Sequence, residues 1–261
     1  MDSPASRPVA SMPAETGPNG RRVIVTGAAG GIGRAIVAAL AAADCRVAAC
    51  DADGAGADAV AGATTSAEFD VRDRAAVRQG VAVAVRALGG CDAVVANAGV
   101  VDTIHRAERF SEDDWALDLE TNLYGAFNVV QATFEELASA GDGRVVLISS
   151  VGAELGIPGQ VAYGASKAGL VGMARTLAAE WAPRGVRCNV VMPGMIATPK
   201  VRAMPGELQS KLAERVPLAR FGTVDELAGV VTFLLSPAAA YITGAVLRVD
   251  GGLGLSLGAI T

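Results

Sequence analysis

The chain has 261 residues, which suits one α/β domain that buries most of the surface its unfolded form exposes. Its formal net charge of -5 and the lack of a basic block argue against a nucleic acid or an anionic membrane as partner. One histidine and scattered cysteines offer no zinc-ligand spacing, so no metal site is expected. The cysteines predict buried thiols in a reducing compartment, with the cytoplasm as the expected location; they are Cys45, Cys50, Cys91 and Cys188.

Residues 1–20 are rich in Pro, Ser and Gly and lack the apolar stretch of a secretory signal, which predicts a disordered leader. From Arg21 onward, apolar β-rich runs alternate with helical patterns, as is typical of a parallel sheet with right-handed crossovers. We therefore expect a single doubly wound α/β domain over 21–261, with a seven-stranded parallel sheet flanked by helices. The expected strands are 22–27, 46–51, 65–71, 92–99, 144–150, 187–194 and 245–252.

Helical patterns occupy the segments between these strands. The expected helices are 31–43, 73–88, 111–139, 163–183 and 224–236. Ser111 predicts the start of the third of these helices, because its hydroxyl can cap free N–H groups at a helix N-terminus. Asp113 and Asp114 support that start, since acidic side chains complement the helix dipole.

A glycine-rich turn, TGAAGGIG over residues 26–33, joins the first strand to the first helix. Glycines there allow a tight bend and bring backbone close to a pyrophosphate, which the helix N-terminus attracts. Gly27, Gly31, Ile32 and Gly33 are therefore predicted to bind a dinucleotide in a Rossmann-type site. A glycine cluster taken alone is a weak signal, because it also occurs in strand–helix turns that bind nothing.

Asp51 closes the second strand 18 residues after Gly33, where an acid can hydrogen-bond the ribose hydroxyls of adenosine. The same carboxylate would repel the 2′-phosphate of NADP, and Ala29 and Gly30 supply no basic residue to bind that phosphate. The sequence therefore favours NAD(H) as the cofactor. A solvated strand-end acid is the other interpretation of Asp51, and Asp53 is a nearby acid that could be confused with it.

Two further strand ends are predicted to border the cofactor. Asp70 and Val71, after the third strand, are placed like an adenine clamp in which the carboxylate and the backbone face the base. Asn97 and Gly99 follow the fourth strand, at the carboxyl edge where open α/β sheets bind ligands. Asn97 is expected both to tie neighbouring strands together and to border the cofactor.

Tyr163 and Lys167 are four residues apart on a strongly helical segment, so their side chains share one face. A free tyrosine titrates near ~10 and is a poor base at neutral pH. A neighbouring ammonium, together with the positive charge of an oxidised nicotinamide, is expected to lower the pKa of Tyr163. The phenol would then exchange a proton with an alcohol while the cofactor carries the hydride.

Ser150 ends the fifth strand, 13 residues before Tyr163, and its hydroxyl is a candidate to hold the substrate oxygen against the phenol. Ser149 should point to the opposite face by strand alternation. Asn122 lies inside an apolar helical pattern, where a buried amide needs partners. One arrangement that supplies them is a kinked helix holding a water that leads to Lys167.

Taken together, these motifs resemble the short-chain dehydrogenase/reductase family, in its short single-domain branch, over essentially all of 21–252. The resemblance rests on TGAAGGIG, NAG and YGASK, with Asp51, Asp70, Val71, Asn122, Ser150, Pro193, Gly194 and Thr198. It implies a catalytic tetrad of Asn122, Ser150, Tyr163 and Lys167. It also implies that Lys167 and Tyr163 border the nicotinamide ribose, and that Thr198 and the backbone after Pro193 hold the carboxamide. A homotetramer follows from the same resemblance, with the helices over 111–139 and 163–183 as its main interface.

The resemblance also places a mobile substrate lid after Pro193, at about 194–216. Lys200 and Arg202 in this lid are candidates to meet an anionic substrate, although a solvated helix face explains them as well. His105 follows the fourth strand and could overhang the pocket, but an incidental loop histidine is the plainer interpretation. Candidates to line the substrate pocket are Glu154, Leu155, Ile157 and Gln160.

The leading hypothesis is an NAD(H)-dependent oxidoreductase that interconverts a secondary alcohol and its ketone on a small, largely apolar molecule, with Tyr163 as acid and base. The second half also resembles 3-oxoacyl-[acyl-carrier-protein] reductases, which makes an NADPH-dependent 3-oxoacyl thioester reductase the alternative. Against it, the glycine turn has no basic residue, and of two arginines expected to dock the acidic carrier only Arg184 is present. A non-catalytic dinucleotide-binding sensor is the third hypothesis, which the intact Tyr163–Lys167 pair argues against.

Overall fold

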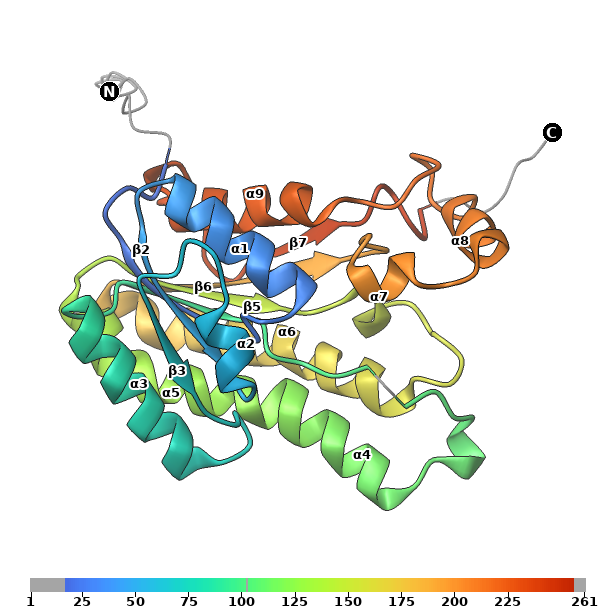
Figure 1. The fold of residues 1–261 in the computed structure, drawn as a ribbon, viewed down its shortest axis with the longest axis horizontal. Helices are drawn as coiled ribbons and strands as arrows, with labels where there is room; N and C mark the ends of the chain where they lie inside the picture. Colours follow the sequence, from blue (N-terminus) through green and yellow to red (C-terminus); the bar gives the residue numbers. More distant parts are fainter. Residues whose placement is uncertain (1–16, 102, 256–261) are drawn as a thin grey trace, which may run out of the picture.

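Seven parallel strands form one sheet in the computed structural model, which describes residues 17–101 and 103–255 (Figure 1). The strands are β1 (Arg22–Thr26), β2 (Arg46–Asp51), β3 (Thr65–Glu68), β4 (Ala93–Ala96), β5 (Gly143–Ile148), β6 (Val186–Pro193) and β7 (Val246–Val249). Their order is β3-β2-β1-β4-β5-β6-β7, so the chain first builds outward from β1 on one side and then from β4 on the other. The expected Rossmann-type, doubly wound parallel sheet is confirmed.

Helices cover both faces of this sheet (Figure 1). They are α1 (Gly31–Ala42), α2 (Gly54–Asp58), α3 (Arg74–Leu88), α4 (Glu112–Leu119), α5 (Gly125–Ser139), α6 (Val161–Trp181), α7 (Pro199–Arg202), α8 (Gly206–Ala213) and α9 (Val224–Leu235). Successive strand residues point to opposite faces. In β1, Val23 and Val25 join the apolar core under α1 and α9, whereas Ile24 joins the core under α3, α5 and α6. Two buried layers therefore hold the sheet rigid behind its carboxyl edge.

Several expected strands extend too far at their carboxyl ends. β3, β4 and β7 end at Glu68, Ala96 and Val249, short of the expected 71, 99 and 252. Beyond β7, Gly251 and Gly252 adopt φ values of 63° and 86°, which a strand does not allow. Past β3, Phe69 and Val71 are buried although they lie outside the strand, so apolar character alone predicts too long a strand there.

The expected helix over 111–139 is interrupted. α4 and α5 are separated by a π-helical turn, Glu120–Tyr124, which contains Asn122. The start at Ser111 is confirmed, because its Oγ accepts a hydrogen bond from the N–H of Asp114 at 3.0 Å. The short helices α2, α7 and α8 were not predicted, since 4 to 8 residues are too few for a recognisable apolar period.

Residues 1–16 of the expected leader lie outside the described residues. Residues 17–20, the rest of the expected leader, are described, and hydrogen bonds connect them to the fold. The carbonyl of Pro18 accepts from the N–H of Arg21 at 3.2 Å, and the N–H of Gly20 donates to the carbonyl of Asp44 at 3.2 Å.

The cysteines are buried free thiols, as expected, and burial raises the pKa of Cys50, Cys91 and Cys188 to about 12. Within 17–101 and 103–255, no cluster of His, Cys, Asp or Glu has the arrangement of a metal site. In the same part of the chain, no helix is long and apolar enough to cross a lipid bilayer.

The amino ends of the strands carry arginines in like-charged cross-strand pairs. Arg22 on β1 lies opposite Arg46 on β2, an arrangement that repels unless acceptors surround it. Arg22 donates to Asp92 from Nε at 2.9 Å and from Nη2 at 2.5 Å. Arg46 donates to the carbonyls of Leu88 and Ala87 at 2.6 and 3.0 Å, at the C-terminus of α3 where the helix dipole favours a cation.

A second like-charged pair, Arg144 on β5 opposite Arg187 on β6, converges on one acid. Asp142 accepts from Arg144 at 2.8 and 2.9 Å and from Arg187, and Arg21 joins it at 2.5 Å. The side chain of Arg144 is only 2% exposed, while that of Asp142 is 48% exposed. One carboxylate therefore holds three guanidinium groups at the amino edge of the sheet.

Candidate active site

A groove of about 710 Å³ lies along the opposite, carboxyl edge of the sheet. Its lining contains ten of the residues predicted to bind the cofactor: Gly27, Gly31, Ile32, Gly33, Asp51, Asp70, Val71, Asn97, Gly99 and Thr198. Three others, Tyr163, Lys167 and Pro193, are not among its lining residues. The sheet edge thus gathers loops that are far apart in the sequence into one binding surface.

The glycine turn enters the groove as bare backbone. Gly27 has a φ of 63°, and a Cβ added there would lie 2.7 Å from the Cα of Ala98. A Cβ on Gly33 would collide with the carbonyl oxygen of Gly27, and one on Gly31 would lie 2.8 Å from the Cδ of Pro199. Glycine is therefore required by close packing at these positions. The turn ends at the N-terminus of α1, where the helix dipole favours an anion, so the residues fit a dinucleotide pyrophosphate.

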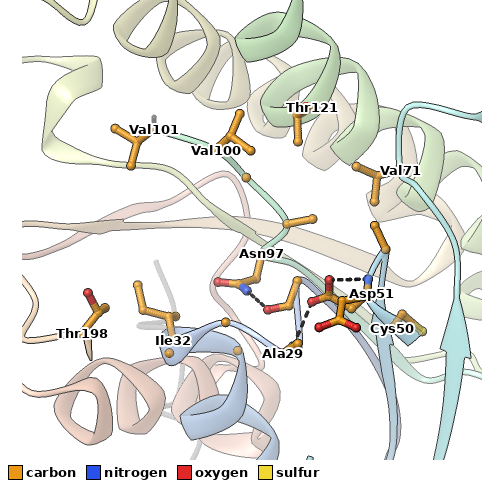
Figure 2. Close-up of a pocket in the computed structure, with 18 of the residues that line it drawn as sticks. Ala29, Ile32, Cys50, Asp51, Val71, Asn97, Val100, Val101, Thr121 and Thr198 are labelled. Atoms are coloured by element: carbon orange, nitrogen blue, oxygen red, sulfur yellow. Dashed lines mark hydrogen bonds between the residues drawn. The ribbon is translucent and has the colours of Figure 1, made fainter. Parts of the chain in front are cut away.

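Asp51 places a carboxylate in the groove wall (Figure 2). Its Oδ2 accepts from the N–H of Ala29 at 2.9 Å, and its Oδ1 accepts from the N–H of Asp53 at 3.2 Å. The side chain therefore links the end of β2 to the glycine turn. Arg34, which follows that turn, donates its guanidinium N–H groups to three backbone carbonyls instead. This end of the groove thus presents negative charge.

Asp70 and Val71 line the groove, where the adenine clamp was expected. The pairing of Asp70 with Arg72 was not predicted. The Asp70 carboxylate accepts from the Nη2 of Arg72 at 2.6 Å, and this hydrogen bond lowers the pKa of Asp70. The carbonyl of Val71 accepts from the Nδ2 of Asn128 at 3.0 Å. In the chain alone, both polar groups are therefore already bonded within the protein, which leaves the buried Val71 side chain as an apolar wall of the groove.

Asn97 links β4 to the glycine turn, because its Nδ2 donates to the carbonyls of Thr26 and Gly27 at 3.1 and 3.0 Å (Figure 2). Thr26, which was not predicted, supports the same junction. Its buried Oγ1 accepts from the N–H groups of Asn97 and Ala98, both at 3.2 Å. A strand-end threonine followed by glycine was the available signal for this role.

The far end of the groove is closed by the segment that follows β6. Thr198 lies opposite Ile32 (Figure 2), and its Oγ1 caps α7 by accepting from the N–H of Val201 at 3.3 Å. Pro193 is buried in β6, so it carries the segment to the groove without lining it. The expected lid over 194–216 contains the short helices α7 and α8.

Ser150, Tyr163 and Lys167 converge beside this groove. Lys167 Nζ lies 5.8 Å from the centroid of the Tyr163 ring, one turn away on α6. The Ser150 hydroxyl is in hydrogen-bonding reach of Tyr163 and also accepts from the N–H of Gly152 at 3.1 Å. Ser149 points away, as strand alternation predicts, and its Oγ donates to the carbonyl of Lys167 at 2.8 Å.

Burial controls the proton affinities of the tyrosine and the lysine. It raises the pKa of Tyr163, an effect that the Ser150 hydroxyl partly offsets and the charge of Asp118 reinforces. It lowers the pKa of Lys167 to about 8, against the opposing influence of Asp118. The predicted lowering by Lys167 and an oxidised nicotinamide concerns the complex with cofactor and stays a prediction. In the chain alone, the lost hydration of a phenolate dominates. Tyr163 therefore holds its proton at neutral pH.

Asn122 lies in the π-helical turn and is fully buried. Its Oδ1 accepts from the N–H of Val100 at 2.8 Å, while its Nδ2 donates to the carbonyl of Val100 at 3.0 Å and to the Oγ of Ser166 at 3.1 Å. Ser166 in turn donates to the carbonyl of Tyr163 at 2.8 Å. The π turn thus corresponds to the expected kink, and its partners are protein groups. Ser166 was not predicted as a site residue. Its position next to Lys167 in YGASK was the available signal.

Gly99 joins the catalytic candidates to the groove. A Cβ added there would lie 2.9 Å from the Oδ1 of Asn122 and 3.1 Å from the Nζ of Lys167. The ammonium therefore sits against the groove wall, where it also donates to the carbonyl of Ile148 at 3.0 Å. Hydroxyl, phenol and ammonium at the end of a dinucleotide-sized groove are the groups that proton-coupled hydride transfer needs.

The residues predicted to line the substrate pocket do not all lie in one hollow. Leu155, Ile157 and Gln160 line a second hollow, of about 700 Å³. Glu154 instead accepts from the Nη1 of Arg248 at 3.0 Å. His105 is exposed, with its Nδ1 3.8 Å from the carboxylate of Asp114, and it lines neither hollow.

The chain is similar to known proteins over most of its length. The model of a family described as enoyl-(acyl carrier protein) reductase matches residues 27–254. A (3R)-3-hydroxyacyl-CoA dehydrogenase of Canis lupus familiaris is 38% identical, over 88% of this chain and 95% of its own. A 3-oxoacyl-[acyl-carrier-protein] reductase of Thermotoga maritima is 37% identical, over 90% and 98%. A D-threitol dehydrogenase of Mycolicibacterium smegmatis is 39% identical, over 90% and 93%.

Among solved structures, a gluconate 5-dehydrogenase from Burkholderia cenocepacia in complex with NADP and tartrate superimposes with a TM-score of 0.86. It is 33% identical to this chain, and the match covers 92% of this chain and 97% of that structure. Fold and site define the class of oxidoreductases that bind a nicotinamide dinucleotide. The chain belongs to the short-chain dehydrogenase/reductase family, as the sequence motifs predicted, and acts on CH–OH groups.

Proposed function

We propose that the chain is an NAD(H)-dependent oxidoreductase that interconverts a secondary alcohol and its ketone. The observation that carries this proposal is the convergence of Ser150, Tyr163 and Lys167 beside a groove with Asp51 in its wall. Apolar side chains dominate the second hollow, near Gly152, which supports a small and largely apolar substrate.

In this proposal, each catalytic side chain has one task. Ser150 donates a hydrogen bond to the substrate oxygen and holds it near the phenol of Tyr163. Tyr163 gives its proton to that oxygen during reduction, and in its phenolate form it takes the proton of the alcohol during oxidation. The positive charges of Lys167 and of an oxidised nicotinamide would favour that phenolate. Lys167, fixed by the carbonyl of Ile148, places a positive charge beside the nicotinamide ribose and the phenol. A bound nicotinamide supplies or accepts the hydride.

Asn122 is proposed as the fourth member of the tetrad with Ser150, Tyr163 and Lys167. Its role is to hold the other elements in place. Its side chain ties the turn after β4 to α6 through Val100 and Ser166. This tie fixes α6, and hence Tyr163, relative to the groove. Because its side chain bonds to Val100 and Ser166, Asn122 is a positioning residue in this proposal.

The preference for NAD(H) rests on the charge at the adenosine end of the groove. The Asp51 carboxylate would accept ribose hydroxyls but repel a 2′-phosphate. Asp53 and Asp70 line the same end, whereas Lys200 is at the opposite end with Thr198. Arg34 is turned to backbone carbonyls, so it is not placed to receive a phosphate.

The names of two relatives favour a second candidate, an NADPH-dependent 3-oxoacyl thioester reductase. One feature of the structure weighs against its carrier-protein form. Arg184, the one matching carrier-docking arginine, lies over the ring of Phe134 at 5.2 Å and pairs with Glu135 at 3.4 Å. The position before β5 where the second arginine is expected falls within residues 140–143, Ala-Gly-Asp-Gly, which contain no basic residue.

We also propose a homotetramer. Large apolar side chains are exposed along α4, the π-helical turn and α5, namely Trp115, Tyr124 and Phe127. A second set lies near the open β7 edge of the sheet, with Phe233 on α9 and Tyr241 fully exposed. Two separate apolar surfaces allow two different subunit contacts, as a tetramer with dihedral symmetry needs. Light scattering after size exclusion tests this, and a monomer at micromolar concentration would refute it.

The decisive test of function compares NAD⁺ and NADP⁺ reduction across secondary alcohols, polyols and 3-hydroxyacyl thioesters. We expect turnover with NAD⁺ and a secondary alcohol, and Asp51→Ala should reduce the preference for NAD⁺ by about tenfold or more. Asp53→Ala removes the neighbouring acid, whose carboxylate is engaged by the N–H of Gly56, and should reduce the preference by much less than Asp51→Ala does. A strong NADP⁺ preference in the wild-type chain, or turnover restricted to thioesters, would select the second candidate instead.

A further inference from the structure

Threonines inside helices ordinarily bond their hydroxyl to a backbone carbonyl one turn earlier. Three helical threonines of this chain do so. Thr133 donates to the carbonyl of Val129 at 3.1 Å, Thr176 to that of Gly172 at 3.3 Å, and Thr232 to that of Ala228 at 2.9 Å. Thr121, in the π-helical turn, is different. Its Oγ1 is buried and has no hydrogen-bond partner among the described residues.

The place of Thr121 explains where such a partner would come from. Its side chain lines the groove, on the wall opposite Asp51 (Figure 2), and the residue is only 9% exposed. Leaving a buried hydroxyl without a hydrogen bond is unfavourable, because the group has lost its bonds to water. Asn122, its neighbour in the same turn, is by contrast bonded to protein groups through both its Oδ1 and its Nδ2.

The neighbours of Thr121 show at which end of the groove its side chain lies. A Cβ added to Gly125, one turn later, would lie 2.5 Å from the Cγ2 of Val71, so this helical face packs on Val71. Val71, Phe69 and Val100 give the adjoining groove wall an apolar character. Asp51 and Asp70 lie at this same end, whereas Thr198 marks the other.

We propose that the Thr121 hydroxyl is a ligand of the adenine ring of the bound dinucleotide. An apolar slot suits a flat aromatic ring, and one hydroxyl can donate to a ring nitrogen or accept from the exocyclic amine. The π turn places this hydroxyl next to Asn122, so one local irregularity serves both adenine binding and the positioning of α6. The inference rests on the proposed dinucleotide function, but adenine is common to NAD(H) and NADP(H).

The test measures dissociation constants for NADH, ADP and reduced nicotinamide mononucleotide by titration calorimetry. Thr121→Val removes the hydroxyl and keeps the shape, and it should weaken NADH and ADP by the same factor, about 3- to 10-fold. Binding of the mononucleotide, which lacks adenine, should not change. Thr121→Ser keeps the hydroxyl and should stay within about twofold of the wild-type chain. Thr133→Val, a buried helical threonine that bonds its own helix, is the matched control and should leave all three constants unchanged.

Three results would overturn the assignment. These are unchanged binding in Thr121→Val, equal losses in the Ser and Val variants, or a loss confined to the nicotinamide mononucleotide. Should the wild-type chain prefer NADPH, the same titrations are run with NADPH and adenosine 2′,5′-bisphosphate. The NAD(H) preference would then have failed, while the adenine contact would still stand or fall on its own measurements.

Discussion

The two ends of the β-sheet use polar residues in opposite ways. At the amino edge, charged side chains pair with one another: Arg22 with Asp92, and Arg21, Arg144 and Arg187 with Asp142. At the carboxyl edge, the residues are glycines, hydroxyls, an amide and a few charged groups that border a groove. The same seven strands therefore end in a charge-paired base and in an open binding surface.

This difference shows how one sheet can separate stability from chemistry. Repulsion between like-charged arginines in register is offset at the amino edge by internal acceptors, so that edge has little left for a ligand. At the carboxyl edge, close-packed glycines keep the groove open and leave backbone groups at the surface of the site. Substitutions at the two edges should accordingly separate loss of folding from loss of turnover.

The largest expected effect is on turnover and comes from the carboxyl edge. Tyr163→Phe removes the proton donor and should lower kcat by about 10²- to 10⁴-fold. The dissociation constant of NADH and the melting temperature should stay close to those of the wild-type chain, because the ring remains. Steady-state kinetics, NADH fluorescence titration and thermal melting measure the three quantities. A kcat within tenfold of wild type would remove Tyr163 from its assigned role.

The next effect is on folding and comes from the amino edge. Asp142→Asn leaves Arg144 and Arg187 opposite each other without their shared carboxylate, which should cost about 3 kcal/mol of unfolding free energy. NADH affinity of the folded protein should not change, since Asp142 lies at the far end of the sheet. Urea denaturation gives the free energy.

The matched control for that substitution is Glu135→Gln, which breaks an exposed pair with Arg184 and should cost about 1 kcal/mol or less. Equal losses from the two substitutions would show that the shared carboxylate has no special importance. A loss of NADH binding by folded Asp142→Asn would show that the two edges are coupled.

The motifs of the carboxyl edge could be predicted because each is local in sequence. The glycine turn, Asp51 at a strand end, and Tyr163 four residues before Lys167 are read within one turn or one strand. The cluster at the amino edge could not, since Arg21, Arg144 and Arg187 converge from three distant segments. No pattern of neighbouring residues carries that information.

Two further features depended on tertiary structure. The π turn at Asn122 requires bonds to Val100 and Ser166 from other elements, so helical periodicity predicted a continuous segment and only the amide of Asn122 indicated a kink. Burial raises the pKa of Tyr163 in the chain alone, and the local sequence shows the Lys167 charge but not this burial. Spacing therefore identifies the reacting groups, whereas packing determines their proton affinities.

A smaller effect is on the pH dependence of stability and comes from Lys167, the buried cation at the carboxyl edge. Burial lowers the pKa of Lys167 from 10.5 to about 8, so the native state releases this proton at a lower pH than the unfolded chain. Between pH 8 and 10.5 the unfolded state binds more protons, and stability must rise with pH in that window. Relative to Lys167→Met, the wild-type chain should gain about 2 kcal/mol across it. Urea denaturation of both proteins over this range measures the gain, and a constant difference would contradict the burial argument.

The smallest effect tests whether neutral hydrogen bonds do at the carboxyl edge what ion pairs do at the amino edge. Thr26→Val keeps the shape of the buried side chain but removes the acceptor for the N–H groups of Asn97 and Ala98. The unfolding free energy should fall by about 1 kcal/mol. Because no charge is involved, this loss should be the same in low and high salt, whereas that of Asp142→Asn should shrink as salt screens the half-exposed cluster. Urea denaturation at two salt concentrations distinguishes them, and a salt-sensitive loss in Thr26→Val would mean that the edges do not differ in the kind of interaction that holds them.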